Sequence, residues 1–280
     1  MPPPDDHRRW IDARDRALRD PEGWLSLVAL HWLRDGETVI TASGDASDRC
    51  VVLDGAVASP AVRVTLDADG RVTATIAPGL DATLGGDPIP QATPVALRDD
   101  RNGPSSVLRF GRLHLTHIHR QHRAALRIRD REAPTLVNFR GVERFPYDPD
   151  FVIYARFEPA AADATIPITL ITEHVEDHPI AGTLVFKVDG REHRLVAEKS
   201  GDSLFVVFGD ATNRRTDDTA TYGGGRFLTV PMPKADGVTT LDFNRAVNPP
   251  CAFTPFATCP TPPESNRLPV AVLAGERRAH

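Results

Sequence analysis

The amino-acid sequence predicts a mainly β protein, with an antiparallel barrel-like or sandwich core and a short N-terminal helical cap. Short segments that alternate apolar with polar residues follow one another along most of the chain. This period of two is typical of strands with one buried face. Helical periodicity is almost absent after residue 36, and the 25 prolines and 20 glycines are suited to many tight turns. Together these observations favour an antiparallel all-β architecture.

The first 36 residues carry the helical signals. Residues 7–18 place apolar side chains at roughly helical spacing, and Pro21 ends that segment. We expect the apolar run of residues 24–30 to form a second short helix, which Gly36 closes. The predicted organisation is therefore a helical cap over residues 1–36 and a β-rich domain over residues 37–280. Alanines near residues 160–165 mark a weak internal boundary in that domain.

The strands of the β-rich domain are predicted from alternation and from the turn residues between segments. An Asp-Gly pair in the stretch 67–70 and another at 189–190 predict hairpin turns. Strands are expected at residues 37–41, 50–53, 62–66, 71–76, 95–97, 106–110, 112–118, 124–128, 152–157, 168–174, 182–188, 193–197, 204–208, 226–230, 239–243 and 268–273.

Composition limits the class of protein and of partner. The chain has 280 residues, 41% hydrophobic and 25% charged, the balance of a soluble globular protein. A net charge of −5 argues against a nucleic-acid partner. The N-terminus lacks the pattern of a signal peptide, and no apolar run is long enough to span a bilayer. We therefore expect a soluble, cytoplasmic protein without a membrane partner.

Three cysteines, Cys50, Cys251 and Cys259, make an odd number that argues against a secreted disulfide framework. A bridge between Cys251 and Cys259 would close a short loop, but a reducing cytosol disfavours it. Either residue could instead be a thiolate nucleophile whose pKa a nearby arginine lowers. A packed, inert thiol is the favoured interpretation of both.

The strongest candidate for a functional site is the segment of residues 241–260, which combines polar side chains with four prolines. On an extended chain Asp242 and Asn244 face the same side, with Arg245 and Asn248 close by. This pattern suits a polar pocket for a small ligand. It suits equally an Asp–Arg pair that pins the proline-rich loop, whose carbonyls need donors.

A run of three glycines precedes Arg226, which also follows Tyr222 and Asp210. The run lacks the Lys-Ser/Thr of a Walker motif, and no βαβ unit surrounds it. Arg226 could clamp a carboxylate or phosphate, since the glycines allow close approach of a ligand. The alternative is a glycine bulge that leads into the strand at residues 226–230.

Histidines gather at His114, His117, His119 and His122. On a strand, His117 and His119 point to one face and His114 to the other. An exposed strand with alternating polar side chains explains these residues, so we predict no metal site here. Residues 172–178 contain two histidines and several acidic residues, but Pro179 and the surrounding β pattern predict a solvated turn.

Several stretches make the chain resemble an uncharacterised bacterial and archaeal family known as a domain of unknown function. The most specific is the segment from Asp242 to Pro260. Other matching stretches are residues 23–27, 30–33, 126–130, 139–146, 155–159, 208–212 and 221–228. The resemblance implies one family unit over nearly the whole chain and brings no activity with it. Val247 departs from the aromatic residue of the family pattern, and the histidine cluster is not part of that pattern.

These residues predict a small-molecule enzyme, most simply a hydrolase of a small polar or anionic substrate. Asp242, Cys251 and Asp210 are the catalytic candidates, with Asp242 as general base or orienting group for water. The substrate-binding candidates are Tyr222, Arg226, Asn244, Arg245 and Asn248. The cofactor stays unknown, and one alternative is a barrel that binds flavin, or haem through His31 or His117. Another is a non-catalytic protein whose proline loop forms a homo-oligomer interface.

Overall fold

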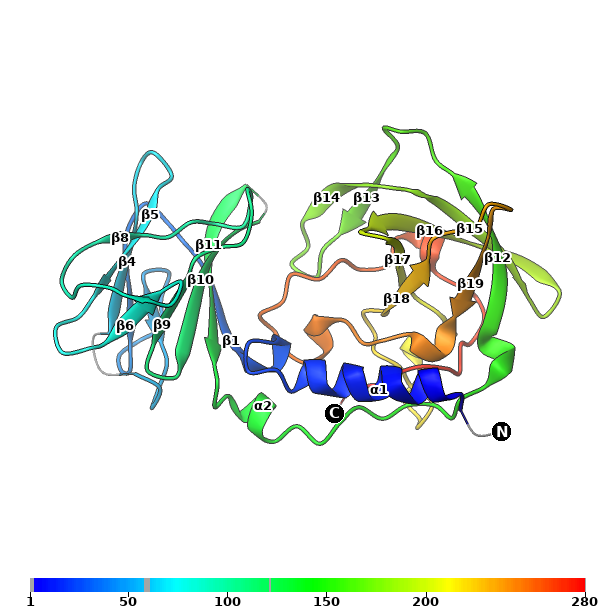
Figure 1. Ribbon diagram of the computed structural model, residues 1–280, viewed down its shortest axis with the longest axis horizontal. Helices are drawn as coiled ribbons and strands as arrows, with labels where there is room; N and C mark the ends of the chain where they lie inside the picture. Colours follow the sequence, from blue (N-terminus) through cyan, green and yellow to red (C-terminus); the bar gives the residue numbers. More distant parts are fainter. Residues whose placement is uncertain (1–2, 58–60, 121, 280) are drawn as a thin grey trace. The chain divides into compact units, whose positions relative to one another are not determined.

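The structure, a computed structural model, describes residues 3–57, 61–120 and 122–279 and confirms a mainly β protein with antiparallel sheets (Figure 1). The chain divides into two compact units. We call Met1–Arg16 together with Arg140–His280 the barrel unit, and Ala17–Phe139 the sandwich unit. The helix α1 (Asp5–Leu18) begins in the barrel unit, which confirms the predicted N-terminal helix.

The sandwich unit consists of two sheets around one core. Residues of both sheets, among them Ile40, Val64, Leu115 and Ile128, are fully buried in a single hydrophobic cluster, as in a β-sandwich. One sheet has the order β1 (Leu27–Trp32), β11 (Arg123–Asp130), β10 (Leu113–Arg120), β9 (Val107–Phe110), β6 (Ala82–Leu84), β7 (Asp87–Pro88). The other has the order β3 (Cys50–Val52), β2 (Gly36–Thr41), β4 (Val62–Leu66), β5 (Val72–Ile76), β8 (Val95–Ala96). A 3-10 turn at Trp24–Ser26 and the short helix α2 (Pro134–Val137) complete the unit.

The barrel unit is built on a six-stranded, nearly closed sheet. Its order is β18 (Arg226–Pro231), β17 (Ser203–Phe208), β16 (Arg191–Ser200), β15 (Gly182–Val188), β12 (Val152–Pro159), β19 (Val238–Asp242). The two end strands meet where the Thr239 hydroxyl donates to the Pro231 carbonyl at 2.7 Å. A two-stranded sheet pairs β13 (Thr165–Thr169) with β14 (Val175–Pro179). Residues 160–164 link β12 to β13, and 3-10 turns occur at Pro149–Phe151, Ala211–Arg214, Phe243–Arg245, Pro250–Ala252 and Glu264–Asn266.

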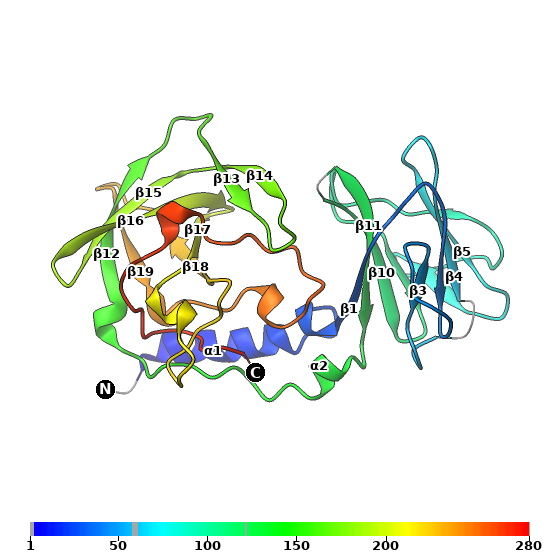
Figure 2. The ribbon, with the colours of Figure 1, turned by 180° about the vertical axis from the view of Figure 1, so that it is seen from behind.

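The core of the barrel unit explains why its strands alternate so regularly. All six strands send buried side chains into one cluster, and Phe208 and Phe243 meet edge to face there, with centroids 5.3 Å apart. The C-terminal segment, drawn red in Figure 2, adds Leu268 and Val272 to the same cluster. Burying these apolar side chains is the main favourable contribution to folding.

The helix predicted at residues 24–30 is wrong. Only a 3-10 turn forms at Trp24–Ser26, and Leu27–Trp32 is the strand β1, paired with β11. A short apolar run does not distinguish a buried helix from a buried strand by its periodicity. The long-range pairing of Leu30 with Arg127 selects the strand.

Two predicted strands also differ from the structure. Residues 168–174 are not one strand, because β13 ends at Thr169 and a tight turn follows, with Leu170 N–H donating to the His174 carbonyl at 2.7 Å. Residues 268–273 form no strand, because the backbone bends at Pro269 and Val270. A carbonyl of this segment, that of Val272, accepts a hydrogen bond from the Arg226 side chain instead of from a neighbouring strand. The strands β1, β6, β7 and β14 were not predicted.

Candidate functional site

Alternation along β18 and β19 brings polar side chains to the face of the barrel sheet opposite the core. Leu241 is fully buried in the core, so its neighbours Thr240 and Asp242 lie on the other face. On β18 the buried Val230 likewise separates Thr229 from Pro231. This face therefore carries hydroxyl and carboxylate groups beside the seam where the sheet closes.

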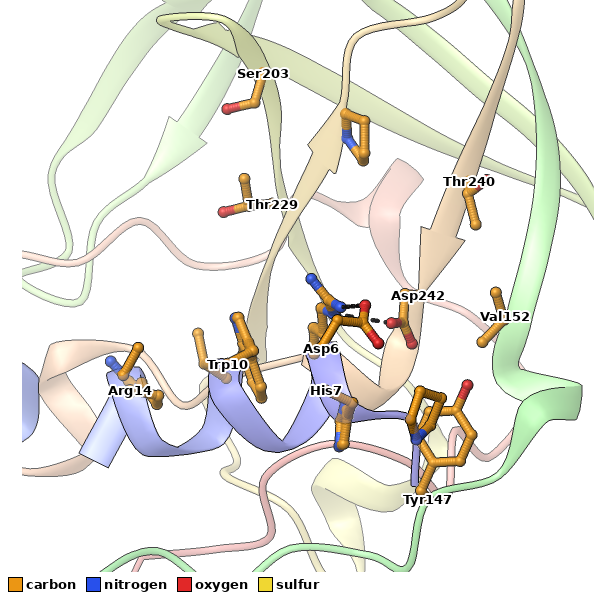
Figure 3. A pocket seen from close by; sticks show the side chains of 15 residues that line it. Asp6, His7, Trp10, Arg14, Tyr147, Val152, Ser203, Thr229, Thr240 and Asp242 are labelled. Carbon is orange, nitrogen blue, oxygen red and sulfur yellow. Dashed lines mark hydrogen bonds and ion pairs between the residues drawn. The ribbon is translucent and has the colours of Figure 1, made fainter. Parts of the chain in front are cut away.

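A cavity of about 740 Å³ lies on this face, next to α1 (Figure 3). We call it the α1 cavity, and all of its lining residues belong to the barrel unit. Its volume is within the range of small-molecule sites. The lining residues are Pro4, Asp6, His7, Trp10, Ala13, Arg14, Tyr147, Val152, Ser203, Thr229, Pro231, Thr240, Asp242, Arg245 and Val247.

One side of α1 forms a wall of the cavity. The helix begins with Asp5 and Asp6 in its first turn, where negative charge is stabilised by the helix dipole. His7, Trp10 and Arg14 follow at spacings of three and four residues, so they share one side of the helix. All three line the cavity, and the rings of His7 and Trp10 stack with centroids 5.7 Å apart.

Asp242 and Arg245, both predicted from the sequence, meet at the cavity. Arg245 Nε lies 3.0 Å from Asp242 Oδ2, and its Nη2 lies 2.6 Å from Asp6 Oδ2. Asp242 Oδ1 also accepts from the backbone N–H and side-chain amide of Asn244, at 3.1 and 3.0 Å. Two carboxylates thus balance the single positive charge of Arg245.

His7 and Tyr147 are the titratable side chains with shifted pKa values beside this ion cluster. Their rings are 4.9 Å apart, and only 4% of His7 is exposed. Burial lowers the pKa of His7, although the negative charge of Asp242 opposes the shift. Burial also raises the pKa of Tyr147, and Asp242 adds to that effect. His7 Nδ1 is buried and has no hydrogen-bond partner among the residues that the structure describes. At neutral pH His7 is therefore a neutral base, and Tyr147 a protonated phenol.

Asn244 and Asn248, two predicted substrate-binding residues, hold backbone segments and do not line the α1 cavity. Asn244 donates to the Asp148 carbonyl and accepts from the Asp148 N–H, both at 2.9 Å. The Asn248 N–H donates to Glu276 Oε2 at 2.7 Å, and its side-chain amide donates to the Arg277 carbonyl at 2.7 Å. These contacts favour the pinning interpretation for both asparagines.

Arg226 and Asp210 form an ion pair that is completely buried. Arg226 Nη2 lies 2.7 Å from Asp210 Oδ2, and neither side chain has any exposed surface. The guanidinium also donates to the carbonyls of Val272, at 2.9 Å, and Ala274, and it lies over the Phe208 ring at 5.3 Å. A ligand in solution does not reach this group, so the geometry does not support the anion clamp or the phosphate contact of the flavin alternative.

The glycines before Arg226 serve close packing. Gly225 has a φ of +86°, and a Cβ there would lie 2.3 Å from Pro262 Cγ. A Cβ on Gly224 would lie 2.5 Å from Cε1 of Tyr222. Real Cβ atoms do not approach other atoms this closely, and φ values in this region favour glycine. The contacts favour a glycine turn that leads into β18.

Tyr222, Cys251 and Cys259 come together away from the α1 cavity. The Tyr222 hydroxyl donates to the Cys251 carbonyl at 3.1 Å, and the Cys251 N–H donates to Cys259 Sγ at 3.3 Å. The structure describes all three cysteines of the chain and contains no disulfide between them. The pKa of Cys251 is lowered to about 7, chiefly by a hydrogen bond from the Cys259 thiol. Burial opposes this shift, and the single Tyr222 O–H, which the Cys251 carbonyl and thiol share, adds to it. The pKa of Tyr222 is raised, and burial is the main cause.

The histidine cluster belongs to the sandwich unit. His117, His119 and His122 line a second cavity of about 370 Å³, and His117 Nδ1 lies 3.0 Å from the Leu97 carbonyl. His114 lies next to Glu22, with Nδ1 3.4 Å from Oε1. Within residues 3–57, 61–120 and 122–279, no group of three or more His, Cys, Asp or Glu side chains is arranged to hold a metal ion.

Sequence reasoning thus found Asp242 and Arg245 but missed Asp6, His7 and Tyr147. The first two missed residues lie more than 200 residues from β19 in the sequence, so no local pattern connects them with it. One signal was available, because His7 and Trp10 share the polar-aromatic side of the N-terminal helix with Arg14.

These features define the class of protein, a mainly β chain with a barrel sheet and a cavity beside a helix. The family described as "Protein of unknown function (DUF1684)" matches residues 137–277, half of the chain, and the chain belongs to this family. The solution NMR structure of an uncharacterized protein from Haloarcula marismortui is 33% identical and covers 50% of this chain and 78% of its own, with a TM-score of 0.41. No curated protein matches the chain. None of the helices among the described residues is long and apolar enough to cross a membrane.

Proposed function

We propose that this protein is a hydrolase that binds a small polar molecule in the α1 cavity. The observation that carries the proposal is the meeting of His7, Tyr147, Asp242 and Arg245 around one cavity of about 740 Å³. These residues come from segments far apart in the chain. Pockets that combine apolar walls with a few converging polar groups and shifted pKa values are typical of active sites.

The charges around the cavity favour a neutral polar substrate over an anionic one. Arg245 is balanced by Asp6 and Asp242, and Arg14 is paired with Glu276 at 2.9 Å. Both lining arginines thus have carboxylate partners. Hydroxyls of Ser203, Thr229 and Thr240 line the cavity as further hydrogen-bonding groups. A substrate with several donors and one apolar face, packed against Trp10, suits this lining.

His7 is the proposed general base. As a neutral imidazole it accepts the proton of a water molecule that attacks the electrophilic carbon of the substrate. The Tyr147 hydroxyl donates to the oxygen on which negative charge then develops. Asp242 orients the water and the substrate. Its oxygens already accept hydrogen bonds from Asn244 and an ion-pair contact from Arg245, which makes a role as proton acceptor less suitable.

The test compares His7→Gln and Asp242→Asn with the unchanged protein on uncharged chromogenic substrates. Suitable compounds are p-nitrophenyl acetate, a p-nitrophenyl glycoside and an N-acetylated aminoacyl p-nitroanilide, with p-nitrophenyl phosphate as the anionic counterpart. We expect turnover of a neutral compound and a fall in kcat/KM of at least about 100-fold for His7→Gln. Arg194→Gln, on an exposed part of β16, is the control and should keep full activity.

Two results would contradict the proposal. The first is turnover by His7→Gln equal to that of the unchanged protein. The second is stabilisation against heat by a neutral compound without any product, which would indicate ligand binding without catalysis. Thermal unfolding of each variant establishes that a loss of activity is not a loss of folding.

A further inference from the structure

Tyr222, Cys251 and Cys259 form a thiol cluster that the proposed hydrolase does not use. None of the three lines the α1 cavity. Cys259 is buried, whereas Cys251 is only half-buried and so lies nearer to solvent. The cluster therefore combines an accessible thiol with a protected one.

Each cysteine is held in place by a different part of the barrel unit. The Cys259 carbonyl accepts from the Ile171 N–H at 2.8 Å, and the next residue but one, Thr261, donates to the Thr169 carbonyl through its N–H and its hydroxyl. Cys251 is held by the Tyr222 hydroxyl at its carbonyl. The two thiols are thus brought together by the fold, and joining them costs little further chain entropy.

The Cys259 thiol lies against the backbone and the thiol of Cys251. Cys259 Sγ lies 3.3 Å from the backbone nitrogen of Cys251. That nitrogen is one bond, about 1.46 Å, from the Cys251 Cα, so the Sγ lies within about 5 Å of that Cα. The Cys259 thiol also forms a hydrogen bond with the Cys251 thiol, so the two sulfurs are in contact. No large backbone movement is required to bring the two sulfurs into bonding distance.

We propose that Cys251 and Cys259 are a redox-active pair that reacts with hydroperoxides, with Cys251 as the attacking thiolate and Cys259 as the resolving thiol. The proposal is independent of the hydrolase in the α1 cavity. Its ligand class is a small hydroperoxide, and its product is an intramolecular disulfide.

The reaction balances in two steps. The Cys251 thiolate attacks the terminal oxygen of ROOH, the O–O bond breaks, and the leaving alkoxide takes up a proton to give ROH and Cys251 sulfenic acid. The Cys259 thiolate, formed by loss of its proton, then attacks the Cys251 sulfur and displaces hydroxide, which takes up that proton as water. Two thiols are oxidised and one hydroperoxide is reduced.

The surroundings of Cys251 support its role as the attacking group. The pKa of its thiol is about 7, because hydrogen bonds from Cys259 and Tyr222 stabilise the thiolate against the effect of burial. A thiol with a pKa near the ambient pH combines a large thiolate fraction with good nucleophilicity. Cys50, half-buried on β3 of the sandwich unit, serves as an internal control.

The test treats the reduced, full-length protein with one equivalent of hydrogen peroxide and follows the intact mass. We expect a loss of about 2 Da, with a peptide map that shows one Cys251–Cys259 bridge. Cys251→Ser should abolish this loss, and Cys50→Ser should leave it unchanged. Cys259→Ser should instead accumulate a sulfenic acid at Cys251 that dimedone traps, a gain of about 16 Da before trapping.

A second measurement separates reactivity from simple proximity. The rate of Cys251 alkylation by iodoacetamide should rise with pH about a midpoint near 7. In Tyr222→Phe the midpoint should move up and the rate at neutral pH should fall several-fold, because one hydrogen bond to the thiolate is lost. The proposal is overturned if peroxide forms no bridge, if Cys50 reacts as fast as Cys251, or if Cys251→Ser is oxidised at the rate of the unchanged protein.

Discussion

Replacing Arg226 by methionine tests whether this arginine stabilises the fold rather than binding a ligand. Methionine has a similar length and keeps the contact with the Phe208 ring, but it lacks the charge and the donors. The change leaves the Asp210 carboxylate buried without its ion-pair partner, 2.7 Å away in the unchanged protein. It also removes the donors of the Val272 and Ala274 carbonyls.

The expected cost follows from these contacts. Breaking a buried ion pair by removing one partner costs about 3–5 kcal/mol. A buried carbonyl that loses its donor costs about 1–3 kcal/mol more, while the apolar surface of methionine offsets part of the loss. We therefore expect the free energy of unfolding of the barrel unit to fall by about 5 kcal/mol. At about 2–4 °C per kcal/mol, the midpoint of thermal unfolding should fall by about 10–20 °C.

Native-state hydrogen exchange, read by mass spectrometry of peptides, measures this effect in each unit separately. Exchange should accelerate in β17 and β18 of the barrel unit, while peptides of β10 in the sandwich unit report on the other core. Arg194→Met is the matched control. Arg194 is 50% exposed and pairs with Glu158 and Glu192 on the surface, so its loss should cost less than about 1 kcal/mol.

The double variant Arg226→Met/Asp210→Asn sharpens the test. If the cost of Arg226→Met comes from the buried Asp210 carboxylate left without an ion-pair partner, removing that carboxylate as well should recover part of the stability. The reasoning is refuted if Arg226→Met is destabilised no more than Arg194→Met. It is also refuted if the barrel peptides keep their protection.

Three further predictions concern stability. Because the pKa of His7 is lowered in the folded state, the unfolded chain takes up the proton first as pH falls below about 6.5; stability is therefore lost on acidification. Between about pH 7.5 and 5.5, His7→Gln should lose less of its free energy of unfolding than the unchanged protein, as urea titrations will measure. Gly225→Ala should be destabilised by more than Gly237→Ala, because both glycines have a positive φ but, of the two, Gly225 lacks room for a Cβ. The difference between the thermal unfolding midpoints of the two variants measures the cost of the clash, and equal midpoints would contradict the prediction. Glu276→Gln should cost about 3 kcal/mol in chemical unfolding, because its buried carboxylate pairs with Arg14 and Arg144; a cost below about 1 kcal/mol would show that these arginines find other partners.

The sequence predicted most strands of both units because alternation is a local signal. On β5, buried Val72, Ala74 and Ile76 alternate with Thr73 and Thr75, and the sequence shows the same period of two. The signal failed where this period is weak. At β1 the run of residues 27–32 is apolar throughout its first half, and only pairing with β11 decides that it is a strand. At residues 268–273 the apolar run predicted a strand, but the backbone bends at Pro269 and Val270, and only single hydrogen bonds join it to Gly209 and Ala211.

The candidate site was predicted in part for a similar reason. Asp242 and Arg245 stand three residues apart, so their pairing follows from a short 3-10 turn that Asp242 caps. Asp6, His7 and Tyr147 join them only through long-range packing of α1 and the segment before β12. The expected roles of Asp210 and Arg226 depended on exposure, which no local pattern reveals.

The sequence by itself determined the mainly β class, the family, the N-terminal helix and the position of most strands. These depend on hydrophobic period and turn residues, which act over a few neighbouring positions. Only the tertiary structure decided which polar residues meet. It buried Arg226 against Asp210, and it brought His7 to Asp242 from more than 200 residues away, because burial and contact depend on how separate segments pack around one core.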